Sequence, residues 1–493
     1  LSCTAEYSNA FGATSSSQVS LVVAAMNATM TRVNGVFEKD LAVHLNMINN
    51  TSLIYYDAAT DPYSDAASMS NWNSELQSNL TATVGESAYD IGHLFGASGG
   101  GGNAGCIGCV CVNGSKGSGI TSPGSGLPSG DSFDIDYVAH EMGHQYGANH
   151  TFTFNANQGL FGERSLASIE PGSGSTIMGY AGITGNTDVQ PHSDDYFSTS
   201  SIAQVSNYIE SITAGGMCPV TTVTGDNAPI ASAGNDYTIP ASTPFMLNGS
   251  ASDIDKSDVL TYTWEQIDVW DKSSNSNTYP TSTTTQGPTF RSVPPTVSTN
   301  RYFPSIETIL TGQTANQWES LSSVSRTLNF RFVVRDNHPG GGQTASDNVL
   351  LTVDGASGPF AVTSPNTTVN WNDGDTYTVT WDVANTNAAP VNCSQVNILL
   401  STDGGNTFPY LLKQNTVNDG TEDVTIPDLP GATSTARIKI QSVGNIFFDI
   451  SDKDFSIANA LPVSWLSFTA EKSGSRSALL NWSTANEINN NHF

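Results

Sequence analysis

The sequence predicts a multidomain protein in which an α/β domain is followed by all-β sandwich modules. Its 493 residues are typical of two to four domains. In roughly the first 220 residues, apolar residues at helical spacing alternate with short strand-like runs. Beyond residue 230 the apolar pattern changes to a period of two, between segments rich in Gly, Ser, Thr and Asn. We therefore expect the chain beyond residue 230 to form all-β modules.

The N-terminal part contains three segments with the apolar spacing of helices. Residues 18–37 and 72–84 predict two of them, and residues 198–212 predict a helix that closes the domain. Strands are expected at 41–48 and 52–56. A further short strand is expected in the run Asp90-Ile91-Gly92-His93-Leu94-Phe95, ahead of a glycine-rich stretch.

One stretch, His140-Glu141-Met142-Gly143-His144-Gln145-Tyr146-Gly147-Ala148-Asn149-His150, has the pattern H-E-x-x-H-x-x-G-x-x-H. His140 and His144 are four residues apart, so on a helix they lie on one face and can bind one zinc ion. His150 would point away if that helix continued. Gly147 accepts the left-handed conformation that ends a helix, which lets the chain bring His150 back.

Three neutral imidazoles leave one position of a zinc ion open, which is typical of a catalytic site. Such an ion lowers the pKa of water towards ~7 and polarises a scissile carbonyl. Glu141 is the candidate general base, which takes the water's proton and passes it to the leaving amine. The expected ligands are therefore His140, His144 and His150.

This motif is the long zinc signature of the metzincin metallopeptidases, and a second stretch resembles their methionine-bearing turn. That stretch is Ser175-Thr176-Ile177-Met178-Gly179-Tyr180. The sequence around it, from Glu170 to Gly182, is similar to that of secreted reprolysin (adamalysin)-like metallopeptidases of Bacteroidetes-type bacteria. Three further stretches resemble that group: Thr60–Tyr63, Tyr89–His93 and His192–Phe197. The resemblance implies an α/β metzincin catalytic domain over residues 1–218, followed by immunoglobulin-like sandwiches.

The resemblance also implies roles for single residues. Met178 would support the floor of the metal site by packing. Tyr180 occupies the position at which astacins and serralysins carry a tyrosine that steadies the oxyanion, whereas adamalysins do without it. The alternative is a tyrosine that packs in the pocket wall. One departure from adamalysins is that Thr151, not Asp, follows the third histidine.

The strand with Gly92, His93 and Leu94 would be the upper rim of the cleft in the resembled family, where a substrate pairs as an added strand. The alternative for His93 is structural, because a lone histidine on a strand is more often part of the packing. The loop at 181–197 would shape the pocket for the residue after the scissile bond.

Five of the six cysteines lie in the first 220 residues. In a secreted protein they are expected to form disulfides. The resemblance implies the pair Cys111–Cys218, and two of Cys3, Cys106 and Cys109 would form a second bridge. Cys393 is expected to be a buried free thiol.

A linker is expected at 219–229 and a first β-sandwich at 230–354, which resembles PKD-like modules of secreted bacterial enzymes. One of its strands places four apolar residues on one face: Leu328, Phe330, Phe332 and Val334. A second sandwich is expected at 359–457. Residues 460–493 are expected to begin a further β module, similar to the one that precedes a type IX secretion sorting domain.

Asp253, Asp255 and Asp258 offer oxygen ligands that suit calcium. The alternative is a polar turn ahead of a strand.

The formal net charge of −28 excludes binding to nucleic acid or to anionic membranes by charge. No stretch approaches the roughly 18 apolar residues that span a membrane. The chain starts at Leu1 without a signal peptide, so we expect a mature form that has lost its targeting and pro-segments. These observations predict a secreted, extracellular or cell-surface protein. The expected partners are protein or peptide substrates, and the expected state is a monomer.

The predicted function is hydrolysis of peptide bonds in proteins by a secreted zinc endopeptidase. The alternative is an adhesin or substrate-binding protein in which the sandwiches matter and the protease is secondary or inactive. The intact set His140, Glu141, His144 and His150 argues against that alternative.

Overall fold

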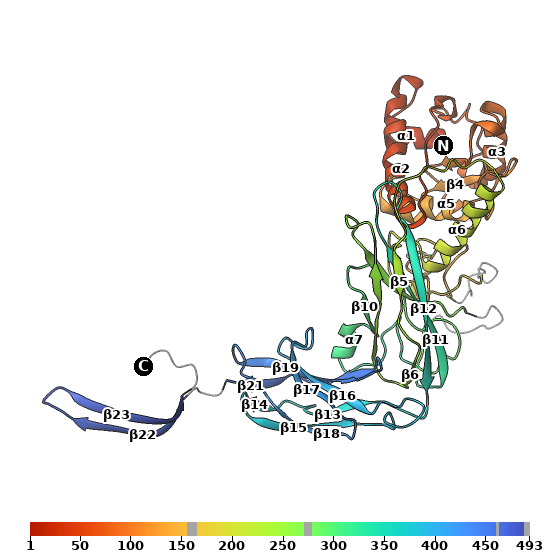
Figure 1. Ribbon diagram of the computed structural model, residues 1–493. Coiled ribbons are helices and arrows are strands. Elements are labelled where there is room, and N and C mark those ends of the chain that lie inside the picture. The colour runs from red at the N-terminus through yellow and green to blue at the C-terminus, as the bar shows by residue number, and fades with distance from the viewer. Residues whose placement is uncertain (155–164, 271–278, 460–462, 488–493) are drawn as a thin grey trace. The chain divides into compact units, whose positions relative to one another are not determined.

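The computed structural model describes residues 1–154, 165–270, 279–459 and 463–487. The chain divides into two compact units. The first comprises Leu1–Ser305 and Thr314–Ala356, and the second comprises Ile306–Gln313 and Ser357–Phe493. The first unit begins with helices around a small sheet and continues as a β-sandwich, and the second is almost all β (Figure 1). The predicted fold class is confirmed.

The α/β part has a four-stranded sheet in the order β1-β2-β4-β3. The strands are β1 (Ser2–Cys3), β2 (His93–Phe95), β3 (Gly101–Asn103) and β4 (Gly119–Ser122). β1, β2 and β4 are parallel, and β3 is antiparallel to β4 at the edge. The helices are α1 (Ala5–Ala10), α2 (Val19–Leu41), α3 (Trp72–Thr83), α4 (Asp131–Phe133), α5 (His140–Gln145) and α6 (Thr199–Ala214). A π-helix, Asp134–Ala139, leads into α5.

Alternate residues of the sheet face two different cores, because successive side chains of a strand point to opposite faces. Leu94 and Ile120 pack with Trp72, Leu76 and Leu80 of α3. Phe95 belongs instead to the larger core that α2, α5 and α6 share. The helices predicted near residues 18–37, 72–84 and 198–212 are therefore confirmed as α2, α3 and α6.

The strand predicted at 41–48 is wrong, because α2 continues to Leu41 and no β-ladder of the described residues includes 42–50. The period of two is nevertheless real. Leu41 and Leu45 are buried, while Val43 and Met47 are partly buried against the same core. The segment is extended and packs without a partner strand. Similarly, the strand expected at 52–56 is a 3₁₀ turn, Thr51–Leu53, and one bridge between Ile54 and Cys3.

The first sandwich contains a four-stranded sheet in the order β6-β12-β11-β9 and two strand pairs, β10-β7 and β5-β8. Its strands are β5 (Ile230–Ser232), β6 (Tyr237–Pro240), β7 (Phe245–Asn248), β8 (Ser250–Ser252), β9 (Thr261–Gln266), β10 (Asn300–Phe303), β11 (Arg326–Arg335) and β12 (Thr344–Asp354). The four apolar residues predicted to share one face of β11 are all buried. Phe330 contacts Phe245, Phe290 and Phe303 in the core.

Among its described residues, the second unit contains one short helix, α7 (Ile306–Leu310), and a sandwich of two sheets. One sheet is β13 (Ala361–Ser364), β15 (Thr376–Asp382) and β18 (Thr421–Thr425). The other is β14 (Asn370–Asn372), β21 (Phe455–Ala458), β19 (Thr433–Ser442), β16 (Gln395–Ser401) and β17 (Tyr410–Val417), with β20 (Phe448–Ile450) beside β19. A hairpin, β22 (Val463–Lys472) and β23 (Ala478–Glu487), follows. Residues 460–462 and 488–493 of the further module lie outside the described residues.

Two disulfides close loops in the α/β part. Cys111 pairs with Cys218, as the resemblance implied, and Cys106 pairs with Cys109. Cys3 and Cys393 are free and buried. The first bridge joins the segment before β4 to the chain just beyond α6.

A fully buried ion pair joins the α/β part to the first sandwich. Arg335, at the end of β11, donates from Nε to Oδ1 of Asp40 in α2 at 2.8 Å, and both side chains are 0% exposed. Arg335 also donates to the carbonyl of Phe197 and to Oγ1 of Thr263. A buried charge without its partner is costly, so each side chain depends on the other.

We expect Arg335→Met to destabilise the first unit by about 3–5 kcal/mol, because it leaves the Asp40 carboxylate buried without a countercharge. Urea unfolding followed by the helical circular dichroism signal measures this loss, since nearly all helices lie in the first unit. The matched control is Arg32→Met. Arg32 pairs with Asp131 and Asp195, but those side chains are 63% and 51% exposed. The control is expected to change stability by about 1 kcal/mol or less. Equal effects of the two substitutions would contradict the prediction.

Candidate metal centre

The three histidines of the motif meet at one point. His140 and His144 lie one turn apart on α5, and the helix ends at the next residue, Gln145. Gly147 then adopts φ +99°, a backbone conformation that side chains rarely accept, and the chain turns. This turn brings Nε2 of His150 to 2.9 Å from Nε2 of His144 and 3.2 Å from Nε2 of His140. The predicted glycine turn is thus present.

The other ring nitrogens fix the orientation of two of these histidines. Nδ1 of His140 donates to the carbonyl of Ile177 at 2.6 Å, and Nδ1 of His144 donates to the carbonyl of Ala148 at 2.7 Å. Burial lowers the pKa of His140 to about 3 and that of His144 to about 4, so both rings are neutral. With the proton on Nδ1, each Nε2 presents its lone pair to the common point.

This donor set fits zinc. Converging lone pairs repel one another unless a cation lies between them, and neutral imidazoles with Nδ1 bonded to a carbonyl are the usual zinc ligands. The ligand atoms of His140, His144 and His150 all lie within 4.8 Å of one another. These three residues are therefore able to hold one zinc ion.

Glu141 lies beside the histidines and is only 7% exposed. Its carboxylate is against the backbone of Gly102 in β3, where an added Cβ would overlap the Glu141 side chain. β3 is the edge of the sheet. The candidate base therefore lies under a strand whose outer side has no partner in the described sheet.

The two residues expected downstream of the motif also lie at the histidines. Met178 is fully buried, and its Sδ would be 2.6 Å from a Cβ added at Gly143, between the two histidines of α5. The ring of Tyr180 has its centroid 4.5 Å from that of His150 and 5.6 Å from that of His140. Met178 thus lies under the helix and Tyr180 beside the third histidine.

The expectation that Gly92, His93 and Leu94 form the open edge of the sheet is wrong. β2 pairs with β1 on one side and with β4 on the other, so it has no free side for an added strand. His93 is 1% exposed, and burial lowers its pKa to about 4. Its neutral ring contacts Gln145 Oε1 through Nδ1 and Thr121 Oγ1 through Nε2. These two contacts tie α5 to the sheet.

Two further carboxylates lie near the site. Glu170 is 1% exposed and its Oε2 accepts hydrogen bonds from Thr151 Oγ1 at 2.5 Å and from Thr176 Oγ1 at 2.6 Å. Asp136, one turn ahead of α5, accepts from the backbone N–H of Ser193 at 2.8 Å. The departure at Thr151 was a signal that another residue supplies a carboxylate there.

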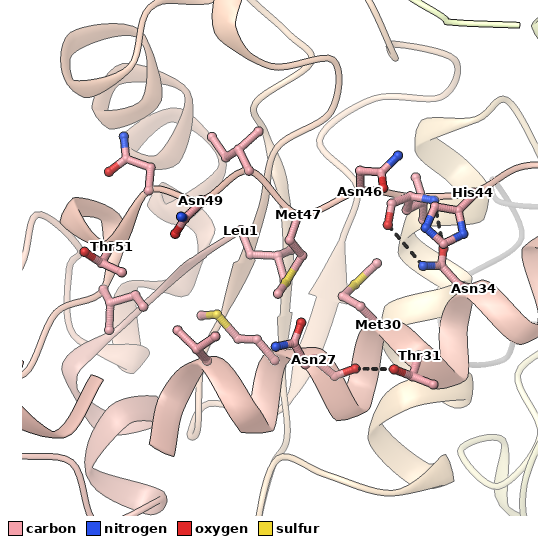
Figure 2. A pocket seen from close by; sticks show the side chains of 16 residues that line it. Leu1, Asn27, Met30, Thr31, Asn34, His44, Asn46, Met47, Asn49 and Thr51 are labelled. Carbon is pink, nitrogen blue, oxygen red and sulfur yellow. Dashed lines mark hydrogen bonds between the residues drawn. The ribbon is translucent and has the colours of Figure 1, made fainter. Parts of the chain in front are cut away.

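A cavity of about 420 Å³ lies elsewhere, between α2 and the segment 44–51. Figure 2 shows Met30 and Asn27 of the helix on one side and Met47 and Leu1 facing them. None of its lining residues belongs to the histidine cluster, the Met178 turn or β3. This cavity is separate from the candidate metal centre.

In the part of the chain that the structure describes, no helix combines the length and the apolar character needed to cross a membrane.

Comparison with solved structures gives matches of low identity. The fibronectin(III)-like modules of Clostridium thermocellum CbhA are 11% identical, with 47% of this chain and 95% of that chain covered and a TM-score of 0.16. A Bacteroides ovatus protein from a mixed-linkage glucan utilization locus is 16% identical, with 48% of each chain covered and a TM-score of 0.14. Drosophila N-cadherin EC1-4 is 10% identical, with 52% and 60% covered and a TM-score of 0.16. No activity or ligand of this chain follows from them.

No curated protein matches the chain. A family model described as Metallo-peptidase family M12B Reprolysin-like matches residues 1–209. That range contains the histidine cluster, Glu141 and the Met178 turn. Residues 1–209 are therefore a reprolysin-like M12B metallopeptidase domain, which makes the enzyme a metalloendopeptidase.

Proposed function

We propose that the chain is a secreted zinc endopeptidase of the metzincin type, similar to the reprolysin-like enzymes of Bacteroidetes, that cleaves peptide bonds in proteins. The observation that carries this proposal is the convergence of three Nε2 atoms beside the buried Glu141. His140, His144 and His150 would hold a zinc ion, which would acidify a water molecule and polarise the scissile carbonyl. Glu141 accepts the proton of the attacking water and passes it to the leaving amine.

The substrate, in this proposal, pairs with β3 instead of β2. β3 is the edge strand, and its outer backbone groups are available to an extended peptide. Gly102 lies over Glu141, so a peptide that pairs with β3 passes directly above the candidate base. The glycines of β3 leave room for its backbone to approach closely.

Tyr180 is proposed to steady the oxyanion of the tetrahedral intermediate. Its ring lies against those of His140 and His150, and the side chain is partly exposed. The phenol hydroxyl is a suitable donor to developing negative charge. Met178 is assigned the packing role described above.

We also propose that this protease is secreted. Two disulfides favour an oxidising compartment, in agreement with secretion. Secretion by the type IX route rests only on the resemblance of the last module. The domain limits 1–218, 219–229, 230–354, 359–457 and 460–493, a monomeric state and the lack of nucleic-acid binding are likewise proposals.

We expect the chain to cleave gelatin and Glu141→Ala to lose about 100-fold or more of this activity at equal zinc content, because the general base is removed. The matched control is Glu210→Ala, on the exposed side of α6, which should cleave like the parent. Zinc content is measured on each sample. If the zinc-loaded parent does not cleave, the alternative of a binding protein with an inactive protease domain takes first place.

We expect Tyr180→Phe to lower kcat by about 100-fold with little change in KM, because the lost hydroxyl acts only on the developing oxyanion. Steady-state kinetics on a fluorogenic peptide measure both parameters. An unchanged kcat would assign Tyr180 to the pocket wall.

We also propose a calcium ion at Asp253, Asp255 and Asp258. Their ligand oxygens lie within 4.8 Å of one another, and Asp258 forms a second such group with Asp226 and His338. The side chains of Asp226 and Asp258 are 0% and 2% exposed. Among the described residues, Asp226 Oδ1 and Asp253 Oδ2 are buried without a hydrogen-bond donor. Buried carboxylate oxygens of this kind favour a hard cation.

We expect calcium to bind with one site by titration calorimetry and to raise the unfolding temperature, since a ligand of the native state stabilises by about 2.7 kcal/mol at 100 times its Kd. Asp258→Asn should abolish both effects. Asp419→Asn, an exposed aspartate in the second sandwich, makes the same charge change and should abolish neither. Absence of binding to the parent would leave the aspartates as a polar turn.

A further inference from the structure

The Glu170 carboxylate takes no part in the proposed reaction, but it forms hydrogen bonds with residues around the metal centre. Besides its two threonine donors, its Oε1 accepts from the backbone N–H groups of Ser175 at 3.0 Å and Thr176 at 3.3 Å. Thr151, the residue after His150, also donates its own N–H to the carbonyl of Met178 at 3.1 Å. The buried carboxylate thereby joins the chain at the third histidine to the turn that carries Met178.

The segment that carries Glu170, here called the floor segment (residues 168–197), is held by the first sandwich. Ser175 Oγ donates to the carbonyl of Ser292 at 3.2 Å, and Tyr196 Oη donates to the carbonyl of Val293 at 3.0 Å. The ring of Trp318 lies against Gly172. The floor segment and the sandwich belong to the same compact unit.

The far end of the floor segment is fixed by the buried ion pair. The backbone N–H of Phe197 donates to Asp40 Oδ2 at 2.6 Å, and its carbonyl accepts from Arg335 Nη2 at 2.9 Å. Tyr196 connects this end of the floor segment to the metal centre, because its carbonyl accepts a hydrogen bond from the N–H of Ile177 at 3.1 Å. The carbonyl of Ile177 in turn orients His140.

From these contacts we propose that Glu170 is a positioning residue of the zinc site and that the first sandwich is a working part of the protease. Glu170 fixes the distance between the third histidine and the turn beneath the metal. Ser292 and Val293 of the sandwich hold that turn from the other side. The proposal rests on the assignment of the histidines as zinc ligands.

The physical basis is the rigidity that a metal site requires. Groups that orient ligands are nearly as important as the ligands, and their loss typically costs about 10–100-fold in metal affinity or activity. A carboxylate with four fixed donors is a strong and directional anchor. The first sandwich holds the segment that carries this carboxylate. Changes in the sandwich are therefore expected to alter the positions of the metal-binding histidines through these hydrogen bonds.

The test compares three variants of the full chain. Glu170→Gln keeps the size of the side chain but replaces an acceptor oxygen by an amide. The double variant Ser175→Ala/Tyr196→Phe removes only the two hydroxyl contacts with the sandwich. Tyr377→Phe removes a hydroxyl from β15 of the second unit and is the control.

Zinc affinity is measured by competition with a chromophoric chelator, and the unfolding temperature is measured on the zinc-free protein. We expect Glu170→Gln and the double variant to bind zinc about 10-fold or more weakly than the control at temperatures where all are folded. Their kcat should fall together with the affinity. Affinities equal to that of the control in both variants would overturn the proposal.

Failure of the proposed function and failure of the Glu170 proposal give different results. If the parent binds zinc but cleaves no peptide, the endopeptidase proposal fails, while the zinc affinities still decide the role of Glu170. If Glu170→Gln does not fold, the double variant still decides the role of the sandwich. The role of Glu170 is then decided by Thr151→Val/Thr176→Val, which removes the two hydroxyl donors to its carboxylate; zinc affinity equal to that of the control would overturn it.

Discussion

Convergence of three imidazoles on one point is the constraint on which the α/β part depends. A helix can present only His140 and His144 to the same ion, so the chain must leave the helix to deliver His150. Gly147 permits this with a positive φ. The residues that follow must then be fixed by other means, because an irregular chain has no internal hydrogen-bond pattern. The Glu170 carboxylate and the Met178 turn supply that fixation.

The sequence was sufficient to predict those parts of the site whose residues are close together along the chain. The spacing of the motif is read along one helix and one turn, and the structure brings those residues together as expected. The order of strands is not local. Nothing in the run from Gly92 to Asn103 showed that the first strand lies inside the sheet and that the glycine-rich stretch forms its edge. Glu170 was equally hidden, because its donors come from two separate segments.

The segment 42–50 shows a different limit of prediction from sequence. Its apolar residues alternate as in a strand, and they do face one core, but that core is formed by a helix and offers no backbone partners. Alternation therefore indicates an extended chain with one buried side, and pairing must be established separately. The sandwiches lacked this ambiguity, because each alternating run there has neighbours of the same kind. The apolar face of β11 was for that reason predictable, although Val333 on the opposite face is buried as well.

The bridge between Cys111 and Cys218 has a consequence for the durability of the enzyme. It closes a loop of 107 residues that contains α5, all three histidines and the floor segment. Exposed loops are the usual sites of proteolytic nicks, and a protease works among its own active copies. A single cut anywhere inside this loop leaves the two pieces covalently joined. The metal centre can therefore persist in a nicked molecule, and self-digestion need not end activity at the first cleavage.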